Sequence, residues 1–268
     1  MLQVIWAIGW SMIVLAGLIF LPTPLVALFG VTMIASHNLL DGIRLESFTM
    51  PDGRLSWVGW LFCILHVENP PVYYPLIPWI GVMAAGYAFG AILLSDTHQR
   101  RRRLLLLGLA LTAAFVALRA INIYGDPNPW SPQKDILFTV MSFLNTEKYP
   151  PSLLYLLMTL GPAIAALVFF ESAQGRLARF LVILGSVPMF FYIIHLYLIH
   201  ASALGAAYLS GFELRSLSTM FFYIPEGYGF SLETVYLVWV AVIFALCPLC
   251  SGYARVKRHR KSAWLSYI

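Results

Sequence analysis

Long apolar runs separated by polar stretches dominate the sequence. Seven of these runs are close in length to the about 20 residues that a helix needs to cross a bilayer. They cover residues 2–20, a run that follows LPTP and ends near Ser36, 73–94, 104–124, 151–170, about 181–206, and 234–250. The pattern predicts an all-α, polytopic transmembrane helix bundle of about seven spans. An odd number of crossings places the two termini on opposite sides of the membrane.

Three polar stretches between the runs are too long to be simple turns: about 38–72, 125–150 and 211–232. Two of them contain short apolar segments, LSWVGWLFCILH at 55–66 and DILFTVMSFL at 135–144. These segments are too short to span, so we expect one or two short re-entrant or interfacial helices that cover a cavity. Amphipathic helices lying on the bilayer surface are the alternative. No internal repeat is evident, and a single membrane domain over residues 1–268 is expected.

Composition supports the membrane assignment. The chain is 60% apolar and 11% charged, whereas a soluble domain has roughly 25% charged residues. This excludes an ordinary soluble globule, a disordered regulator and a disulfide scaffold. The three cysteines show no metal-ligand spacing, because Cys63 lies far from Cys247 and Cys250. We therefore expect no metal, and a lipid bilayer rather than nucleic acid as the partner.

The charges divide the loops into two sets. Arginine and lysine in short loops are retained on the cytoplasmic side. Alternate connections and the C-terminal tail hold 11 of the 17 basic residues and only 2 of the 12 acidic ones, namely Asp96 and Glu171. The basic groups are Arg100–Arg103, Arg176, Arg179, and the residues Arg255, Lys257, Arg258, Arg260 and Lys261. The sorting predicts a cytoplasmic C-terminus and an N-terminus outside.

Ionisable residues near the predicted outer ends of spans are the first candidates for chemistry. The second run ends in SHNLLDGI, where His37 and Asp41 are four residues apart and Asn38 lies beside them. On a continuous helix they share a face, and a carboxylate one turn from an imidazole supports a general base. A polar helix end closed by Gly42 is the alternative. In the sixth run, Tyr192 and His195 share a face, with an interhelical hydrogen bond as the other interpretation of His195.

Two further segments carry candidate anion-binding residues. The fourth run ends in LRAINIYGDP, where Arg119 could bind a phosphate or carboxylate or could snorkel to the interface, with Asn122 nearby. In EKYPPS, prolines mark a helix start, which places Lys148, Tyr149 and Ser152 at a helix N-terminus, where anions are favoured. An interfacial anchor is the alternative for Lys148.

Five segments together resemble one family. They are SHNLLDGI, YPLIPWIGVMAAGYAFG, FLNTEKYPPSLLYLLMTLGP, PMFFYIIHLYLIH and the closing WLSYI. In this order they resemble bacterial polytopic proteins grouped with the heparan-alpha-glucosaminide N-acetyltransferase catalytic domain. Family members usually begin with about three further helices that open with a D-x-x-R-G motif. No segment matches that block, so the chain resembles the C-terminal two-thirds of such a protein.

The resemblance implies an integral membrane acyltransferase. Its donor substrate would be acetyl-CoA or another acyl-CoA from the cytosol, and its acceptor an extracytoplasmic sugar-type small molecule, in a bacterial cytoplasmic membrane. In that interpretation His37, Asp41 and His195 serve the proton transfer, and the other candidates hold substrate. A truncated non-catalytic protein and a transporter or lipid-binding protein are the alternatives, and a homo-oligomer is left open.

Overall fold

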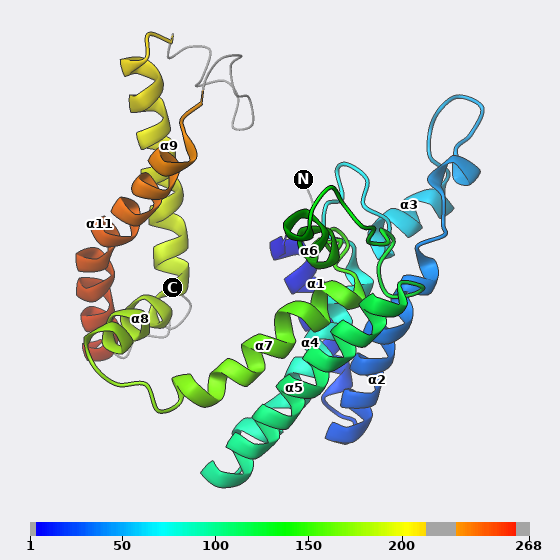
Figure 1. Cartoon of the computed structure of the whole chain (residues 1–268), viewed down its shortest axis with the longest axis horizontal. Coiled ribbons are helices and arrows are strands. Elements are labelled where there is room, and N and C mark those ends of the chain that lie inside the picture. The colour runs from blue at the N-terminus through cyan, green and yellow to red at the C-terminus, as the bar shows by residue number, and fades with distance from the viewer. Residues whose placement is uncertain (1–3, 213–228, 261–268) are drawn as a thin grey trace. The chain divides into compact units, whose positions relative to one another are not determined.

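The computed structural model describes residues 4–212 and 229–260, and the regular structure over those residues is entirely helical (Figure 1). Within these residues, six helices are long and apolar enough to cross a membrane. They are α2 (Thr23–Ser36) with its 3-10 extension η1 (His37–Leu40), α4 (Leu76–Leu93), α5 (Thr97–Ile121), α7 (Leu153–Phe170), α9 (Pro188–Leu209) and α11 (Leu232–His259). The predicted polytopic helical fold is confirmed.

The chain divides into two compact units, Met1–Ser172 and Ala173–Ile268, and each is described by itself. The single membrane domain over residues 1–268 stays a prediction. Most of the polar stretch 211–232 and the closing WLSYI lie outside the described residues.

Two of the seven expected spans differ from the prediction. The first apolar run forms α1 (Val4–Leu18), whose 15 residues are fewer than the about 20 of a full crossing. The expected span over about 181–206 is two helices, α8 (Arg176–Ser186) and α9, which meet at Val187. Pro188 has no N–H to continue α8, and it is accommodated at the first position of the new helix.

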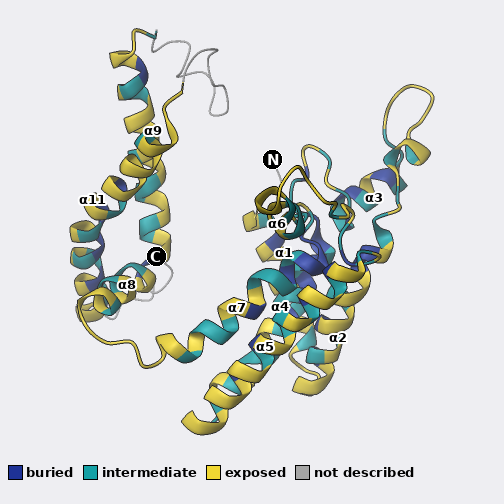
Figure 2. Ribbon diagram, in the orientation of Figure 1, coloured by how far each residue is buried: buried dark blue, intermediate teal, exposed yellow. Residues whose placement is uncertain are grey.

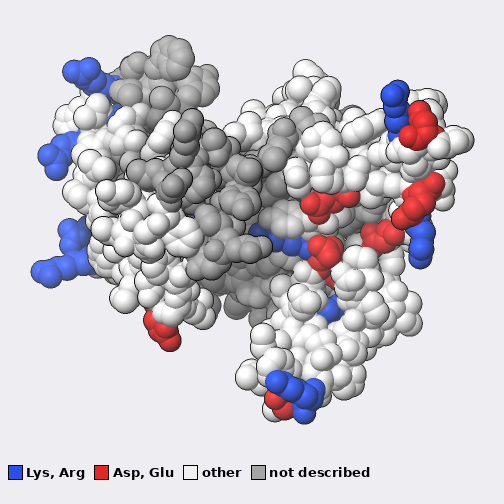
Figure 3. Space-filling view, turned by 90° about the horizontal axis from the view of Figure 1, so that it is seen from above, with Lys and Arg blue, Asp and Glu red and all other residues white. Residues whose placement is uncertain are grey.

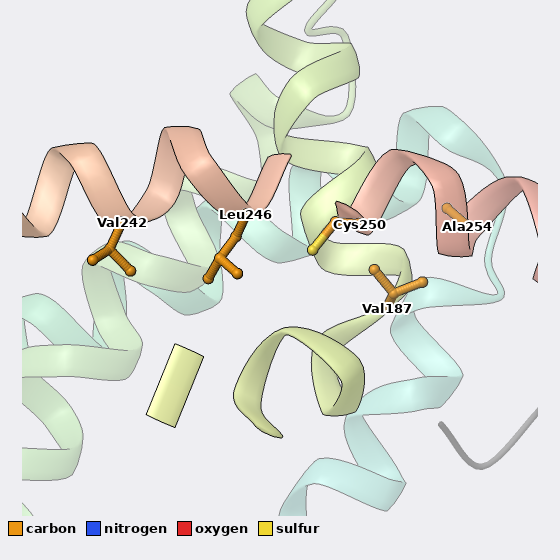
Figure 4. Close-up of a cluster of buried hydrophobic side chains, with 5 residues drawn as sticks. All are labelled: Val187, Val242, Leu246, Cys250 and Ala254. Carbon is orange, nitrogen blue, oxygen red and sulfur yellow. The ribbon is translucent and has the colours of Figure 1, made fainter. Parts of the chain in front are cut away.

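The second unit packs α11 against α8 and the start of α9. Figure 4 shows Leu246, Cys250 and Ala254 along one side of α11, close to Val187 at the α8–α9 junction. Val187, Leu246 and Cys250 are fully buried. The helix break therefore supplies the centre of this small core.

In the first unit, small residues allow two pairs of helices to approach closely. A Cβ added to Gly30 of α2 would lie 2.5 Å from the backbone nitrogen of Ala85 in α4. A Cβ on Gly108 of α5 would lie 2.5 Å from the backbone nitrogen of Ala165 in α7. The small side chain of Ala85 in α4 therefore permits the close approach of α2, whereas Gly86 in the same helix faces open space.

These helix pairs belong to a tandem repeat, which corrects the expectation of no internal repeat. In each half, a long helix is followed by a nine-residue helix and then by a second long helix: α2, α3 (Trp57–Leu65) and α4, then α5, α6 (Ile136–Leu144) and α7. Both short helices lie within the apolar segments predicted to form them. Each is followed by a glutamate, a Pro-Pro pair and an isolated antiparallel bridge, Asn69 with Val72 and Lys148 with Pro151.

The two repeats run in the same direction, because their connecting segments meet at one end. Tyr124 at the end of α5 donates a hydrogen bond to the carbonyl of Ala35 in α2, and Tyr74 before α4 lies beside Tyr149 before α7. We call this end of unit 1 the polar-loop end. The opposite end, where α5 begins with Arg100–Arg103 and α7 finishes, is the arginine end. Figure 2 shows that many buried residues of this unit lie in α4 and the first part of α7, towards the polar-loop end.

Candidate functional site

The end of α2 places His37 differently from the prediction. The α-helix tightens to a 3-10 turn at His37, so Asp41 does not pair with this imidazole. The ring nitrogens lie 2.8 Å from the carbonyl oxygen of Ile34 and 2.9 Å from that of Pro151. Because both nitrogens face carbonyl oxygens in this arrangement, neither is free to take a proton from a substrate.

Asp41 instead pairs with His66, the residue that caps the C-terminus of α3. The Nε2 atom of His66 is 2.9 Å from one carboxylate oxygen of Asp41, and Asn38 donates to the other oxygen at 2.7 Å. An ionised carboxylate only accepts, so Nε2 carries the hydrogen and Nδ1 carries the lone pair. Within the described residues, Nδ1 is buried and has no hydrogen-bond partner. This is the arrangement of an oriented general base.

The N-terminus of α7 is already occupied by protein groups. The backbone N–H of Leu153 donates to the side chain of Asn38 at 2.9 Å, and the N–H of Leu154 donates to the carbonyl of Gly125. The N–H of Tyr155 donates to the hydroxyl of Ser152, the N-cap of α7. Ser152 is confirmed at the helix N-terminus, but these backbone donors are not open to an anionic substrate. The Ser152 hydroxyl itself donates to the carboxylate of Asp126 at 2.7 Å, so an internal anion lies there.

Arg119 is 1% exposed and is fully engaged inside the protein. Its guanidinium donates to four backbone carbonyls of the segment that contains α6, and it lies 3.8 Å from Asp126. The acceptors are the carbonyl oxygens of Asn128, Ser142, Phe143 and Asn145. These contacts fix the loop rather than present a charge to a ligand. Asn122 is structural in the same way, since its side chain pairs with both the N–H and the carbonyl of Trp130.

Lys148 and Tyr149 lie at the surface of the polar-loop end. The Lys148 ammonium is 5.0 Å from the Tyr149 ring centroid. Tyr74 donates to the Tyr149 hydroxyl at 3.5 Å, and this bond, together with burial, raises the pKa of Tyr74 to about 12. The Tyr74 bond and Lys148 lower the pKa of Tyr149, while Tyr149 raises the pKa of Lys148. Burial and the nearby Glu147 raise the pKa of the Glu68 carboxyl.

Tyr192 and His195 lie in the second unit, on α9. Their rings are 5.4 Å apart, and the Nδ1 atom of His195 faces the carbonyls of Phe191 and Tyr192 in its own helix. These contacts lie within α9, whereas the alternative interpretation expected a hydrogen bond between helices. A catalytic role for His195 stays a prediction, as do substrate-binding roles for Tyr192, Lys148 and Tyr149.

An apolar groove of about 610 Å³ runs along α2 and reaches the candidate site. Its walls include Leu25, Phe29 and Met33, and its polar end is formed by Ser36 and His37. No group of three or more His, Cys, Asp or Glu side chains in the described parts of the chain is placed to hold a metal ion.

Sequence reasoning missed His66 as Asp41's partner. The signal that could have found it is the position of His66 at the end of a short apolar helix in a polar stretch, one helix after SHNLLDGI. Asp126 was also missed, and it follows a helix end at Asn122, where the backbone adopts a left-handed conformation.

Among the described residues, six helices are long and apolar enough to cross a membrane, which indicates a multi-pass membrane protein, and unit 1 holds a buried polar cluster at its polar-loop end. Residues 1–125 match the family described as heparan-alpha-glucosaminide N-acetyltransferase, catalytic. Residues 1–125 are thus similar to this catalytic domain, and the matched range contains His37, Asp41, His66 and Arg119. The EKYPPS segment that contributes to the resemblance lies beyond it. No curated protein and no solved structure matches the chain.

Proposed function

We propose that the chain is a membrane acyltransferase. It moves an acyl group, such as acetyl, from a cytosolic acyl-CoA to an extracytoplasmic acceptor of the sugar type. The family match over residues 1–125 supports this class. The observation that carries the chemistry is the buried His66, held by Asp41 through Nε2 and with Nδ1 left unpartnered among the described residues.

In the proposed reaction, the hydroxyl oxygen or amine nitrogen of the acceptor attacks the thioester carbonyl. His66 Nδ1 accepts the proton that this oxygen or nitrogen loses. The tetrahedral intermediate collapses, the carbon–sulfur bond breaks, and the CoA thiolate leaves. The proton on Nδ1 then passes to the thiolate. Asp41 is a positioning residue that holds the productive tautomer and stabilises the imidazolium formed during transfer.

Substrate access is part of this proposal. The His66 side chain is 3% exposed, so a substrate reaches Nδ1 only when the groups packed over it move aside. His37 lies beside it, with ring centroids 5.7 Å apart, and joins the cluster to the carbonyl of Pro151. His37 therefore serves to hold α7 against the proposed base, a positioning role in place of the base role expected from sequence.

The charge distribution supports the proposed orientation. At the arginine end, Arg100 pairs with Glu171 and also donates to the carbonyl of Ser95. At the polar-loop end, the described ionisable groups include Asp41, Asp126 and Glu147. Because basic residues mark the cytoplasmic side, the arginine end faces the cytosol and the polar-loop end faces outward in a bacterial cytoplasmic membrane.

The test is turnover by purified protein in lipid nanodiscs. Acetyl-CoA is supplied with a panel of amino sugars and sugar alcohols, and both free thiol and acylated product are measured. We expect His66→Gln to lower kcat by about 100- to 10,000-fold. Asp41→Asn should lower it by a smaller factor and change the pH profile, because the tautomer is no longer held.

His259→Gln is the matched control, since His259 is an exposed histidine of the second unit whose Nδ1 faces the carbonyl of Arg255 in its own helix. It should retain full turnover. Equal activity of the His66→Gln and His259→Gln proteins would remove His66 from the mechanism. Absence of acetyl-CoA consumption by the wild-type protein with every acceptor would overturn the acyltransferase proposal.

A further inference from the structure

A second groove, of about 480 Å³, lies at the arginine end of unit 1, far from the His66 cluster. Most of its lining comes from one face of the first two and a half turns of α5, with Val168 contributed by α7. The α5 residues that line it are Thr97, His98, Arg101, Arg102 and Leu105. The spacing of three and four residues places His98, Arg102 and Leu105 in a row along the helix, from polar to apolar.

The four arginines at this end have different structural roles. Arg100 is engaged by Glu171, by the carbonyl of Ser95 and by Thr97. Arg101 reaches the carbonyl of Val168 at 3.5 Å and lies 3.8 Å from Glu171. Arg102 makes no hydrogen bond or ion pair with any of the residues the structure describes, although it lines the groove. Its charge is therefore uncompensated where the cavity lies.

If α5 spans the membrane, its length places the groove at the depth of lipid headgroups. α5 has 25 residues, which at 1.5 Å per residue is about 38 Å, longer than the roughly 30 Å hydrocarbon core. The excess length falls in the arginine-rich first turns, because charged side chains are excluded from the apolar core. Leu105 and Val168 then lie just inside the core, below the charged part of the same cavity.

We infer that this groove binds an anionic phospholipid. The phosphate group is bound by Arg102 and Arg101, and an acyl chain lies against Leu105 and Val168. A basic groove between transmembrane helices at the cytoplasmic side suits such a headgroup. The phosphates of an acyl-CoA share this chemistry, so CoA is the competing ligand in the binding test. The groove suits a lipid because its charged end, with Arg101 and Arg102, continues into an apolar end at Leu105 and Val168.

The test compares two neighbouring arginines. Wild-type, Arg102→Gln and Arg103→Gln proteins are purified in detergent and titrated with phosphatidylglycerol, with phosphatidylcholine, or with CoA. Bound molecules are counted by native mass spectrometry. Arg103 belongs to the same basic run and is exposed, but it does not line the groove, so Arg103→Gln removes the same charge outside the cavity.

We expect wild type to retain phosphatidylglycerol in preference to phosphatidylcholine. Arg102→Gln should weaken this binding about fivefold, and the double variant Arg101→Gln/Arg102→Gln about 30-fold, whereas Arg103→Gln should change it less than about twofold. Equal losses in Arg102→Gln and Arg103→Gln would overturn the site, because they would indicate general surface charge. Binding of CoA that depends on Arg102, without selective lipid binding, would also overturn it.

These outcomes are independent of catalysis. Lipid binding is measured without turnover, and the His66→Gln protein should bind phosphatidylglycerol as wild type does. Loss of lipid selectivity with intact acyl transfer would overturn this inference and leave the proposed function in place. Selective lipid binding by a protein that shows no acyl transfer would support this inference and overturn the proposed function. Figure 3 shows the charged side chains as separate groups on an otherwise largely uncharged described surface.

Discussion

The two repeats of unit 1 share one helical plan but treat their buried ionisable groups differently. In the second repeat, Arg119 is satisfied by four backbone carbonyls and Asp126 by Ser152 and the N–H of Glu147. In the first, Asp41 holds His66 but leaves Nδ1 without a partner in the described chain. A satisfied group stabilises a loop, whereas an unsatisfied imidazole keeps a lone pair for chemistry. The difference separates a structural half from a candidate reactive half.

The largest expected effect is on Arg119. Arg119→Leu should destabilise the protein by about 3–5 kcal/mol, because Asp126 and several carbonyls lose a buried cationic partner. His66→Leu should lower the free energy of unfolding by only about 1–3 kcal/mol, the penalty for leaving Asp41 short of one donor. Denaturant unfolding in detergent measures both, with the exposed Arg103→Leu as control. Similar losses for Arg119→Leu and His66→Leu would end the contrast between the halves.

The close helix contacts should respond alike in both repeats. Gly30→Ala and Gly108→Ala each place a Cβ 2.5 Å from a backbone nitrogen of the facing helix, so each should destabilise by about 1–3 kcal/mol. Gly86→Ala has open space and should be neutral or stabilising by up to about 1 kcal/mol. Thermal unfolding compares the three. A neutral result at Gly30 alone would mean that the first repeat is packed more loosely than the second.

The next largest effect is expected at Asn38, whose side chain accepts a hydrogen bond from Leu153 and so joins the two repeats. Asn38→Ala removes the side-chain acceptor for the Leu153 N–H and the donor to Asp41, and we expect a loss of about 0.5–2 kcal/mol. Ser152→Ala, which removes the local cap of α7, should cost a similar amount. Hydrogen exchange at the start of α7 reports both changes. If Asn38→Ala leaves this exchange unchanged, the repeats are joined mainly by other contacts.

The smallest effect concerns the tyrosine pair between the two turns. The pKa of Tyr74 is raised to about 12, chiefly by its hydrogen bond to Tyr149. The contact therefore contributes stability that is present below pH 10 and lost as the pH rises through about 12. Tyr149→Phe should move the Tyr74 pKa down towards 10 in a tyrosinate absorbance titration. Tyr155→Phe is the control, and an unchanged Tyr74 titration in Tyr149→Phe would show that the bond is not formed.

Much of the fold was predictable because apolar length and short-helix segments are local properties of the sequence. The limits of α7 differ from the predicted run by two residues at one end, and α3 and α6 fall inside their predicted segments. Pro188 indicated an interruption of the helix from sequence. Whether a proline kinks one helix or begins a new one depends here on the packing of α8 against α11.

The candidate site was less predictable because its contacts join distant parts of the chain. Asp41 has an imidazole neighbour, but it comes from residue 66 and not from the adjacent turn, since the 3-10 geometry at His37 changes the direction of the side chains. For Arg119 the sequence predicted binding of a phosphate or carboxylate, or snorkelling to the interface. The partners of Arg119 are backbone carbonyls, which no side-chain pattern identifies.

The bonds from His37 to Pro151 and from Asn38 to Leu153 have a consequence for biosynthesis. They join residues 114 and 115 positions apart. At 5–20 residues per second, a ribosome needs roughly 6–23 s to make the partners after these two polar side chains have emerged. During that interval water or the insertion machinery must satisfy them. The first repeat therefore enters the membrane with its polar end open, and the arrival of α7 closes it.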